Sequence, residues 1–305
     1  MDEQRRQRGG VFYGLAAYGA WGLLPLYFKA VGSVPPMEVL AHRVVWSLVM
    51  LVVLSAARGR LGEFRRLLRD GRTRLTLACT TCLIAFNWGV FIWAIDNERL
   101  LDASLGYFIN PLFTVLLGFV FLREKLRPLQ IGAVGLAALS IVWLTVSHGR
   151  LPWISVGLAI SFGFYGLLRK RVDASGVQGL TAETLLLTPV AVAWMIWREG
   201  RGALHFLHVA PALSLLLAAA GVVTASPLIW FAESARRLRL VTLGFMQYLA
   251  PTGQFLLAVT VFGEPFGRTQ AVGFGLIWLA LALYVYDTLH GLRAGEPHPQ
   301  ERPAP

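Results

Sequence analysis

The second half of this chain repeats the residue pattern of its first half 140 positions later. The repeated positions hold leucines, glycines, a phenylalanine, a proline, an arginine, a glutamate and a glutamine. They are Phe91, Arg99, Leu100, Pro111, Leu116, Leu117, Glu124, Gln130, Gly135, Leu136 and Leu139 in the first copy and Phe231, Arg239, Leu240, Pro251, Leu256, Leu257, Glu264, Gln270, Gly275, Leu276 and Leu279 in the second. The pattern indicates an internal duplication, whose copies we place at residues 11–147 and 152–289.

Both copies consist mainly of apolar runs of about twenty residues, which is enough helix to cross ~30 Å of hydrocarbon. Hydrophobic residues make up 56% of the chain and charged residues only 15%, whereas charged residues make up roughly 25% of soluble domains. We therefore predict an all-α integral membrane protein with ten transmembrane helices. These helices are predicted at 11–31, 37–57, 75–95, 102–122, 128–147, 152–168, 181–198, 210–231, 241–262 and 269–289.

Each copy contains five predicted helices. An odd number of crossings makes the second copy insert in the opposite orientation to the first. Many secondary transporters use inverted repeats of this kind to build two matching half-sites around a cavity near the middle of the membrane. The duplication therefore favours a carrier.

The formal net charge of +11 would favour nucleic-acid binding in a soluble protein, but here the basic residues lie in the connections between apolar runs. If the N-terminus is inside, the inner connections and tails hold 21 Lys and Arg residues and the outer connections hold six. This bias follows the positive-inside rule. We predict cytoplasmic termini, with tails at 1–10 and 290–305 of which the second is disordered, and no nucleic-acid partner.

Polar side chains form one stripe on each of two predicted helices. Tyr107 and Asn110 share a helical face in the first copy, and Gln247 and Gln254 share one in the second, where Tyr248 adds a hydroxyl. Because polar groups inside a membrane are costly, these stripes predict the lining of a polar cavity. The alternative is that the small residues on the same faces only pack helices together.

A proline interrupts each of these two helices, Pro111 in the first copy and Pro251 in the second. Proline removes one backbone donor and frees the carbonyl one turn earlier, which membranes tolerate against neighbouring helices or beside a wet cavity. We expect both prolines to act as pivots during transport; the alternative is that they merely kink the helices.

Three ionisable residues lie close together in the helix predicted at 37–57, namely Glu38, His42 and Arg43. An arginine near the bilayer centre costs ~2.5–3.5 kcal/mol on insertion scales, so Arg43 needs a partner or a water-filled cavity. It pairs internally with Glu38 or bonds to carbonyls at a helix end, or else it presents a fixed positive charge to a substrate carboxylate or phosphate. In the second case the substrate would be anionic or zwitterionic. His42 could titrate near neutral pH and couple transport to protons.

Other candidates come from residue type and position. Asn87 would supply hydrogen bonds, while Trp88, Trp21 and Tyr165 would form apolar walls or, alternatively, anchor helix ends at the interface. Trp21 follows Tyr18 by three residues and precedes Pro25 by four. Glu183 stands in the second copy near the position of Glu38 in the first, and we hypothesise gate or boundary roles for both.

No motif indicates catalysis or a bound cofactor. The chain lacks a Walker A sequence, an H-E-x-x-H motif and a G-x-S-x-G motif, and its paired Cys79 and Cys82 read as small packing residues. We therefore expect no enzyme activity, no metal and no cofactor. Transport would be driven by a proton, another ion or a solute gradient, or it would run downhill.

Five longer segments carry a family resemblance: EVLAHRVVWS at 38–47, NWGVFIWA at 87–94, DASLGYFINP at 102–111, SFGFYGLLRKR at 161–171 and LGFMQYLAP at 243–251. With them the chain resembles RarD-type permeases, a branch of the EamA family in the drug/metabolite transporter superfamily. The resemblance implies a ten-helix bacterial inner-membrane permease with two EamA repeats, both termini cytoplasmic and a central cavity shared by the two halves.

We therefore expect a secondary transporter that moves a small organic metabolite or drug by alternating access, as a monomer or homodimer in the lipid bilayer. Two alternatives remain at this stage. One is a membrane sensor that binds a solute without moving it, and the other is a membrane-embedded enzyme that modifies lipids.

Overall fold

The computed structural model describes residues 3–59, 69–97, 99–149, 153–263 and 267–293, and every regular element in these ranges is an α-helix. The helices are α1 (Glu3–Ala30), α2 (Pro36–Ala57), α4 (Gly71–Asp96), α5 (Leu100–Leu122), α6 (Pro128–His148), α7 (Trp153–Arg171), α8 (Gly176–Glu199), α9 (Pro211–Arg237), α10 (Leu240–Gln247), α11 (Leu249–Thr260) and α12 (Arg268–Arg293).

Helices occupy the ranges predicted from the apolar runs, although several extend beyond them: α4 begins at Gly71, α8 begins at Gly176 and α9 ends at Arg237. Three differences concern the two tails and one divided helix. Helix α1 begins at Glu3, so most of the tail expected at 1–10 is helical. Helix α12 continues to Arg293, which is beyond the predicted end at 289. The rest of the tail expected at 290–305 lies outside the described residues.

The third difference is that the single helix predicted at 241–262 is divided into α10 and α11, which meet at Tyr248. The cause is Pro251, the third residue of α11. Its nitrogen carries no hydrogen, and its ring clashes with the carbonyl four residues earlier, that of Gln247. Helix α5, by contrast, runs without a break through Pro111.

Length and hydropathy mark seven helices of the described chain as able to cross a membrane. The qualifying segments are Arg5–Ala30, Pro36–Ala57, Gly71–Ala94, Pro128–Ser147, Gly176–Glu199, Pro211–Arg237 and Ala271–His290. A shorter apolar segment covers Gly106–Leu122 in α5. Helix α7 ends in three basic residues, and α10 and α11 are short because of the break between them. The fold is thus that of a multi-pass membrane protein.

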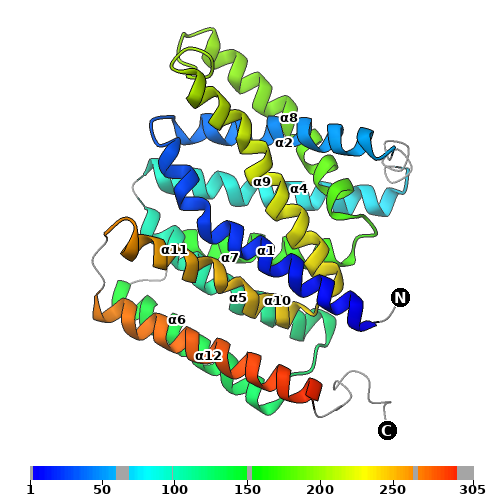
Figure 1. Cartoon of the computed structure of the whole chain (residues 1–305), viewed down its shortest axis with the longest axis vertical. Helices are drawn as coiled ribbons and strands as arrows, with labels where there is room; N and C mark the ends of the chain where they lie inside the picture. Colours follow the sequence, from blue (N-terminus) through cyan, green and yellow to red (C-terminus); the bar gives the residue numbers. More distant parts are fainter. Residues whose placement is uncertain (1–2, 60–68, 98, 150–152, 264–266, 294–305) are drawn as a thin grey trace.

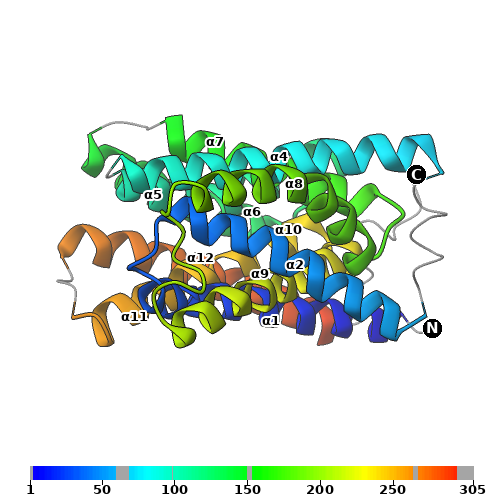
Figure 2. The ribbon, with the colours of Figure 1, turned by 90° about the horizontal axis from the view of Figure 1, so that it is seen from above.

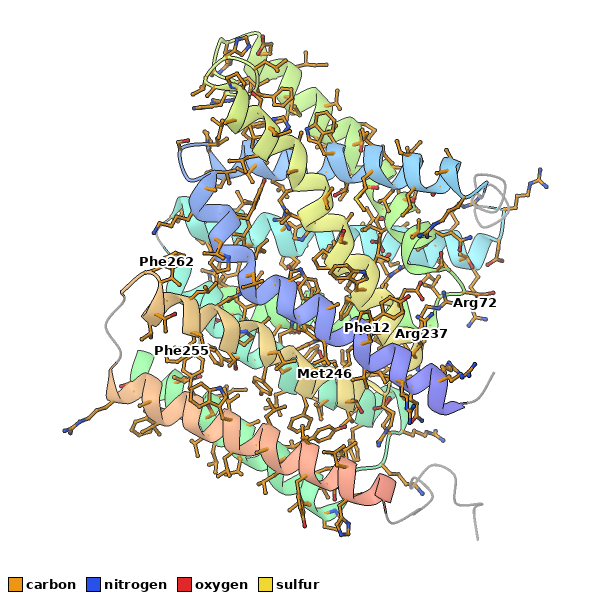
Figure 3. The ribbon with its side chains drawn as sticks, in the orientation of Figure 1. Phe12, Arg72, Arg237, Met246, Phe255 and Phe262 are labelled. Atoms are coloured by element: carbon orange, nitrogen blue, oxygen red, sulfur yellow. The ribbon has the colours of Figure 1, made fainter. Side chains whose placement is uncertain are left out.

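The helix axes are roughly aligned across the molecule, at different tilts, and the chain runs back and forth along them (Figures 1 and 2). The first turn of α1 and the last turn of α12 lie at the same end, on the right in both views. Arg72 and Arg237 lie at this end, whereas Phe262 lies at the opposite end, where α11 finishes (Figure 3).

Helix contacts in the two halves of the described chain correspond when each helix is matched to the one that the sequence repeat pairs with it, α10 and α11 together counting as the partner of α5. Helix α1 packs on α9 and α11, and its counterpart α7 packs on α4 and α5. Helix α2 packs on α9 as α8 packs on α4. In three further contacts a helix packs on its own counterpart in the other half of the chain: α2 on α8, α5 on α10 and α6 on α12.

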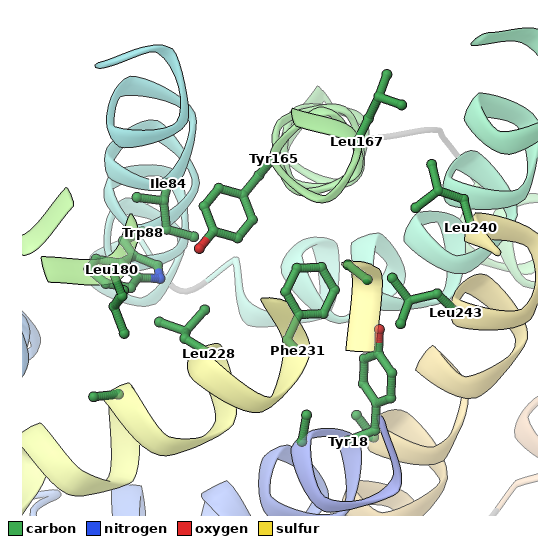
Figure 4. Packing of buried hydrophobic residues seen from close by; sticks show 14 of the residues in the cluster. Tyr18, Ile84, Trp88, Tyr165, Leu167, Leu180, Leu228, Phe231, Leu240 and Leu243 are labelled. Atoms are coloured by element: carbon green, nitrogen blue, oxygen red, sulfur yellow. The ribbon is translucent and has the colours of Figure 1, made fainter. Parts of the chain in front are cut away.

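The main apolar core lies in the middle of the bundle, where residues from both copies meet. Tyr18, Trp88, Tyr165, Phe231 and Leu243 belong to it (Figure 4). A second core lies between α5, α10 and the outer pair formed by α6 and α12. The central core positions the polar residues described next.

Candidate functional site

A cavity of about 120 Å³ lies beside the central core. Four helices of each copy contribute to it: α1, α2, α4 and α5 from the first, and α7, α9, α10 and α11 from the second. Its described lining consists of Tyr18, Trp21, Leu24, Phe28, Arg43, Asn87, Trp88, Phe91, Gly106, Tyr107, Asn110, Leu158, Phe162, Thr224, Leu228, Gln247, Ala250, Pro251 and Gln254. Thus the cavity is shared between the two halves of the chain.

Arg43 reaches this cavity from α2. Its Nε donates a hydrogen bond of 2.9 Å to Thr224 Oγ1 on α9. The guanidinium carbon lies 5.1 Å from the centroid of the Trp88 ring and 5.8 Å from that of Phe28, within the range of cation–π attraction. Among the described residues no carboxylate forms an ion pair with Arg43.

Glu38, the alternative partner considered for Arg43, is fully buried and is engaged elsewhere. Its Oε1 accepts hydrogen bonds from the backbone N–H groups of His205, at 2.7 Å, and Phe206, at 3.2 Å. Its Oε2 lies 2.9 Å from His205 Nδ1. Glu38 therefore holds the connection between α8 and α9 against the start of α2, and it leaves Arg43 without that counter-charge.

The four predicted amide side chains all line the cavity, and three of them bond to other helices. Asn87 Nδ2 donates to Leu158 O at 3.0 Å and to Ser161 Oγ at 2.9 Å. Gln247 Oε1 accepts from the Thr114 hydroxyl at 3.3 Å. These bonds tie α4 to α7 and α5 to α10.

Gln254 and Asn110 complete this amide set. Gln254 Nε2 donates to the backbone carbonyl of Trp21 at 3.1 Å. Asn110 Oδ1 is buried and has no hydrogen-bond partner among the described residues. A buried acceptor without a partner is costly. A bound solute that donates a hydrogen bond to Asn110 Oδ1 would remove this cost.

Aromatic rings form most of the cavity wall. Trp21 and Trp88, both predicted, lie there with Phe28, Phe91 and Phe162. Tyr107, also predicted, presents 38% of its surface. Its ring meets that of Phe91 edge to face. The lining is therefore apolar and aromatic, with few polar groups, as in most small-molecule sites.

Three residues predicted to contact substrate do not line the cavity. His42 is adjacent to Arg43 but rotated by about 100° on the helix; its Nδ1 accepts from Trp46 Nε1 at 3.1 Å, and its ring packs on Phe206. Tyr248 is buried in the second core, facing away from the cavity, and its hydroxyl has no described partner.

Tyr165 is the third of these residues. It is fully buried, and its hydroxyl donates to Glu183 Oε2 at 3.1 Å. Glu183 also accepts from Thr80 Oγ1 at 2.7 Å and lies 4.0 Å from Arg169 Nε. This buried group joins α4, α7 and α8 and is separate from the cavity.

The two predicted pivots differ in position. Pro251 lines the cavity, whereas Pro111 does not and instead packs against α10, where a Cβ placed on Gly244 would lie 2.7 Å from the Pro111 carbonyl oxygen.

Among the described residues, no three His, Cys, Asp or Glu side chains come together as a metal site.

Sequence reasoning passed over Tyr18 and Thr224. Tyr18 is buried at the cavity wall beside Gln247, and Thr224 accepts the hydrogen bond from Arg43. Both signals were available: Tyr18 stands three residues before Trp21, and Thr224 is a polar residue near the middle of an apolar run. What was missing was the contact between α2 and α9, which no local pattern specifies.

Comparison with known proteins identifies the family. Residues 8–146 match the EamA-like transporter family. RarD of Salmonella typhi is 45% identical over 291 residues, covering 95% of this chain and 99% of that protein. An uncharacterized transporter of Vibrio cholerae is 44% identical and covers 96% of both chains.

A solved crystal structure, described only as that of a protein, supports the fold alone. It aligns with a TM-score of 0.67 at 20% identity, over 90% of this chain and 96% of that one. The sequence relatives are much closer and span nearly the whole chain. This chain therefore belongs to the EamA-like transporter family, in its RarD-type branch, as a multi-pass bacterial membrane protein of solute transport.

Proposed function

We propose that the protein is a secondary carrier, which moves a small organic solute through the central cavity by alternating access. The observation that carries this proposal is the position of the cavity, because four helices from each copy line it. A site placed between two similar halves can open to either side when one half rocks against the other.

Two further observations support an inverted arrangement with ten crossings. The helix packing is largely preserved when the two copies are exchanged. The α1 start and the α12 end lie at one end of the molecule (Figure 1), where the basic residues Arg72 and Arg237 also lie (Figure 3). By the positive-inside rule this end faces the cytoplasm, so both termini are cytoplasmic in the inner membrane.

In this orientation aromatic rings close the cavity toward the cytoplasm. Phe231 stacks on Tyr165 with an interplanar angle of 16°, and it also contacts Phe162, Trp21 and Tyr18. We take this state to be closed on its inner side. Opening would separate these rings, with Pro251 and Pro111 as pivots. Glu38 and Glu183, the two residues expected as gates, are buried in contacts away from the cavity, so we assign them no part in opening.

The cavity volume points to a small solute. Sites for drug-sized ligands usually enclose about 300–1,000 Å³, whereas this cavity encloses about 120 Å³. One chain supplies both halves of the cavity, so a monomer is sufficient as the transport unit, whether or not the chain dimerises. An ion gradient or a counter-transported solute would drive accumulation.

Uptake into liposomes that contain the purified protein tests this proposal. Labelled metabolites should accumulate, and Tyr107→Phe and Asn110→Ala, both in the cavity, should reduce uptake. Tyr248→Phe is the matched control, because that hydroxyl lies outside the cavity. Binding without accumulation would favour a sensor, and chemical conversion of a labelled lipid would favour an enzyme. Equal uptake by folded cavity variants would place the site elsewhere.

A further inference from the structure

The central cavity contains a single formal charge. Of its described lining residues, Arg43 alone is ionised near neutral pH; the others are apolar, aromatic or neutral polar residues. The lining thus offers a positive charge with no negative charge beside it.

The contacts of Arg43 leave most of its donors available. A guanidinium carries five N–H donors, and the described residues supply one acceptor, Thr224 Oγ1, which takes the Nε hydrogen. Trp88 and Phe28 present ring faces that attract the cation without accepting a conventional hydrogen bond. Glu38 is occupied by the connection between α8 and α9.

An intramembrane cation in this setting favours a mobile counter-ion. A buried charge without a partner is strongly destabilising, and intramembrane arginines face partners or water-filled cavities. A solute carboxylate would neutralise Arg43 with paired charge-assisted hydrogen bonds, which are about twice as strong as neutral ones.

We propose that this cavity selects small organic monoanions, with the carboxylate at Arg43 and an apolar or aromatic body against Trp21, Trp88 and Phe162. This inference rests on the proposed function and specifies its substrate class. Zwitterions and organic cations are disfavoured, because an ammonium group would find no carboxylate among the described lining residues. The free acceptor of Asn110 can orient a polar substituent of the solute.

The cavity volume agrees with a body of about one ring. A dry protein cavity of about 150 Å³ binds benzene, and this cavity encloses about 120 Å³. The aromatic walls also suit a flat solute, because flat side chains contact it over much of its surface. In this state the enclosed space matches the ring of a small aromatic carboxylate, and Arg43 in the cavity wall matches its charge.

Four probes with the same phenyl body test the inference on the full-length protein in lipid nanodiscs. They are 3-phenylpropanoate, which is an anion, 3-phenylpropanamide, which is neutral, phenylalanine, which is a zwitterion, and 2-phenylethylamine, which is a cation. Calorimetric titration of the wild type should give the tightest binding for 3-phenylpropanoate. Equal or tighter binding of phenylalanine or 2-phenylethylamine would overturn the inference, and this arm needs no mutation.

Variants then assign the selectivity to Arg43. Arg43→Gln should weaken 3-phenylpropanoate binding by about 10- to 100-fold, since hydrogen bonds to charged groups contribute ~1.5–3 kcal/mol. Arg43→Lys keeps the charge but loses the paired geometry, so its loss should be smaller. The control is Arg72→Gln, which removes an exposed charge at the start of α4 and should leave binding unchanged. Unchanged binding in a folded Arg43→Gln protein would overturn the assignment.

Liposome uptake separates this inference from the proposed function. Anion-selective binding through Arg43 without uptake would support the inference and refute the carrier. Uptake that prefers cations, zwitterions or neutral solutes would support the carrier and overturn the inference. Failure of 3-phenylpropanoate to bind at millimolar concentration would also overturn it.

Discussion

Gln254 on α11 donates a hydrogen bond of 3.1 Å from its Nε2 to the backbone carbonyl of Trp21 on α1. Pro25 lies four residues after Trp21 inside α1 and has no N–H, so this carbonyl cannot make its usual helical bond. The side chain of one copy therefore satisfies a backbone group freed in the other. The helices approach closely here: a Cβ on Gly253 would lie 3.0 Å from Gly22 Cα.

This relationship predicts coupling between Gln254 and Pro25. Gln254→Leu should destabilise the protein by about 1 kcal/mol, the scale of a hydrogen bond between membrane helices. In a Pro25→Ala background residue 25 regains its N–H and can bond to the Trp21 carbonyl, so the same change should cost much less. Thermal unfolding of the four proteins in detergent forms a double-mutant cycle. Additive effects would show that the two residues act independently.

The helix ranges predicted from the sequence agree with the structure better than the predicted surroundings of individual side chains do. Apolar runs of membrane length are a local property, so the helix ranges could be predicted. The division of the helix predicted at 241–262 was not, because Pro111 carries the same signal as Pro251 and leaves α5 unbroken. The rotation of each helix about its axis depends on its neighbours. Thus His42 and Arg43, adjacent in sequence, face different surroundings: Arg43 faces the cavity and His42 packs on Phe206.

The same reasoning explains which polar residues were placed well. Tyr107, Asn110, Gln247 and Gln254 were chosen because polar residues inside a membrane need a partner, and all four line the cavity. Tyr165 was expected to form an apolar wall of the site, but it is buried outside the cavity and its hydroxyl donates to Glu183. Residue type alone could not show this, because the partner carboxylate lies on another helix.

Gly221 sets the distance between α9 and α2, the two helices that carry Thr224 and Arg43. A Cβ at this position would lie 2.4 Å from both the carbonyl carbon and oxygen of Trp46, which are backbone atoms and cannot rotate away. Gly221→Ala should therefore lower the melting temperature and weaken solute binding. Gly89→Ala in α4 is the control, because a Cβ there meets nothing within 4 Å; it should be neutral or stabilising by up to about 1 kcal/mol. Equal effects of the two changes would contradict the close approach.

The hydrogen bonds that Glu38 accepts should restrain the motion of the connection between α8 and α9. It accepts two backbone hydrogen bonds from this connection and contacts the His205 ring. Glu38→Ala should speed amide hydrogen exchange around His205 and Phe206 by tenfold or more, because each hydrogen bond to a charged group contributes ~1.5–3 kcal/mol. Glu38→Gln should have a smaller effect, since its carbonyl oxygen can still accept. Glu199→Gln alters the exposed pair with His208 in the same region and should change the exchange little.

The buried pair of Arg169 and Glu183 predicts a non-additive effect on stability. Both side chains are fully buried, and Glu183 also accepts from Thr80 and Tyr165. Glu183→Leu leaves Arg169 buried without its counter-charge and should destabilise the protein by about 3–5 kcal/mol. Adding Arg169→Leu removes the stranded charge and should recover part of that loss, although the two hydroxyl donors would still lack their acceptor. Glu183→Gln keeps an acceptor oxygen and should fall between the wild type and Glu183→Leu. Chemical unfolding in detergent measures all four proteins, and a double variant less stable than Glu183→Leu would show that Arg169 is held mainly by contacts other than Glu183.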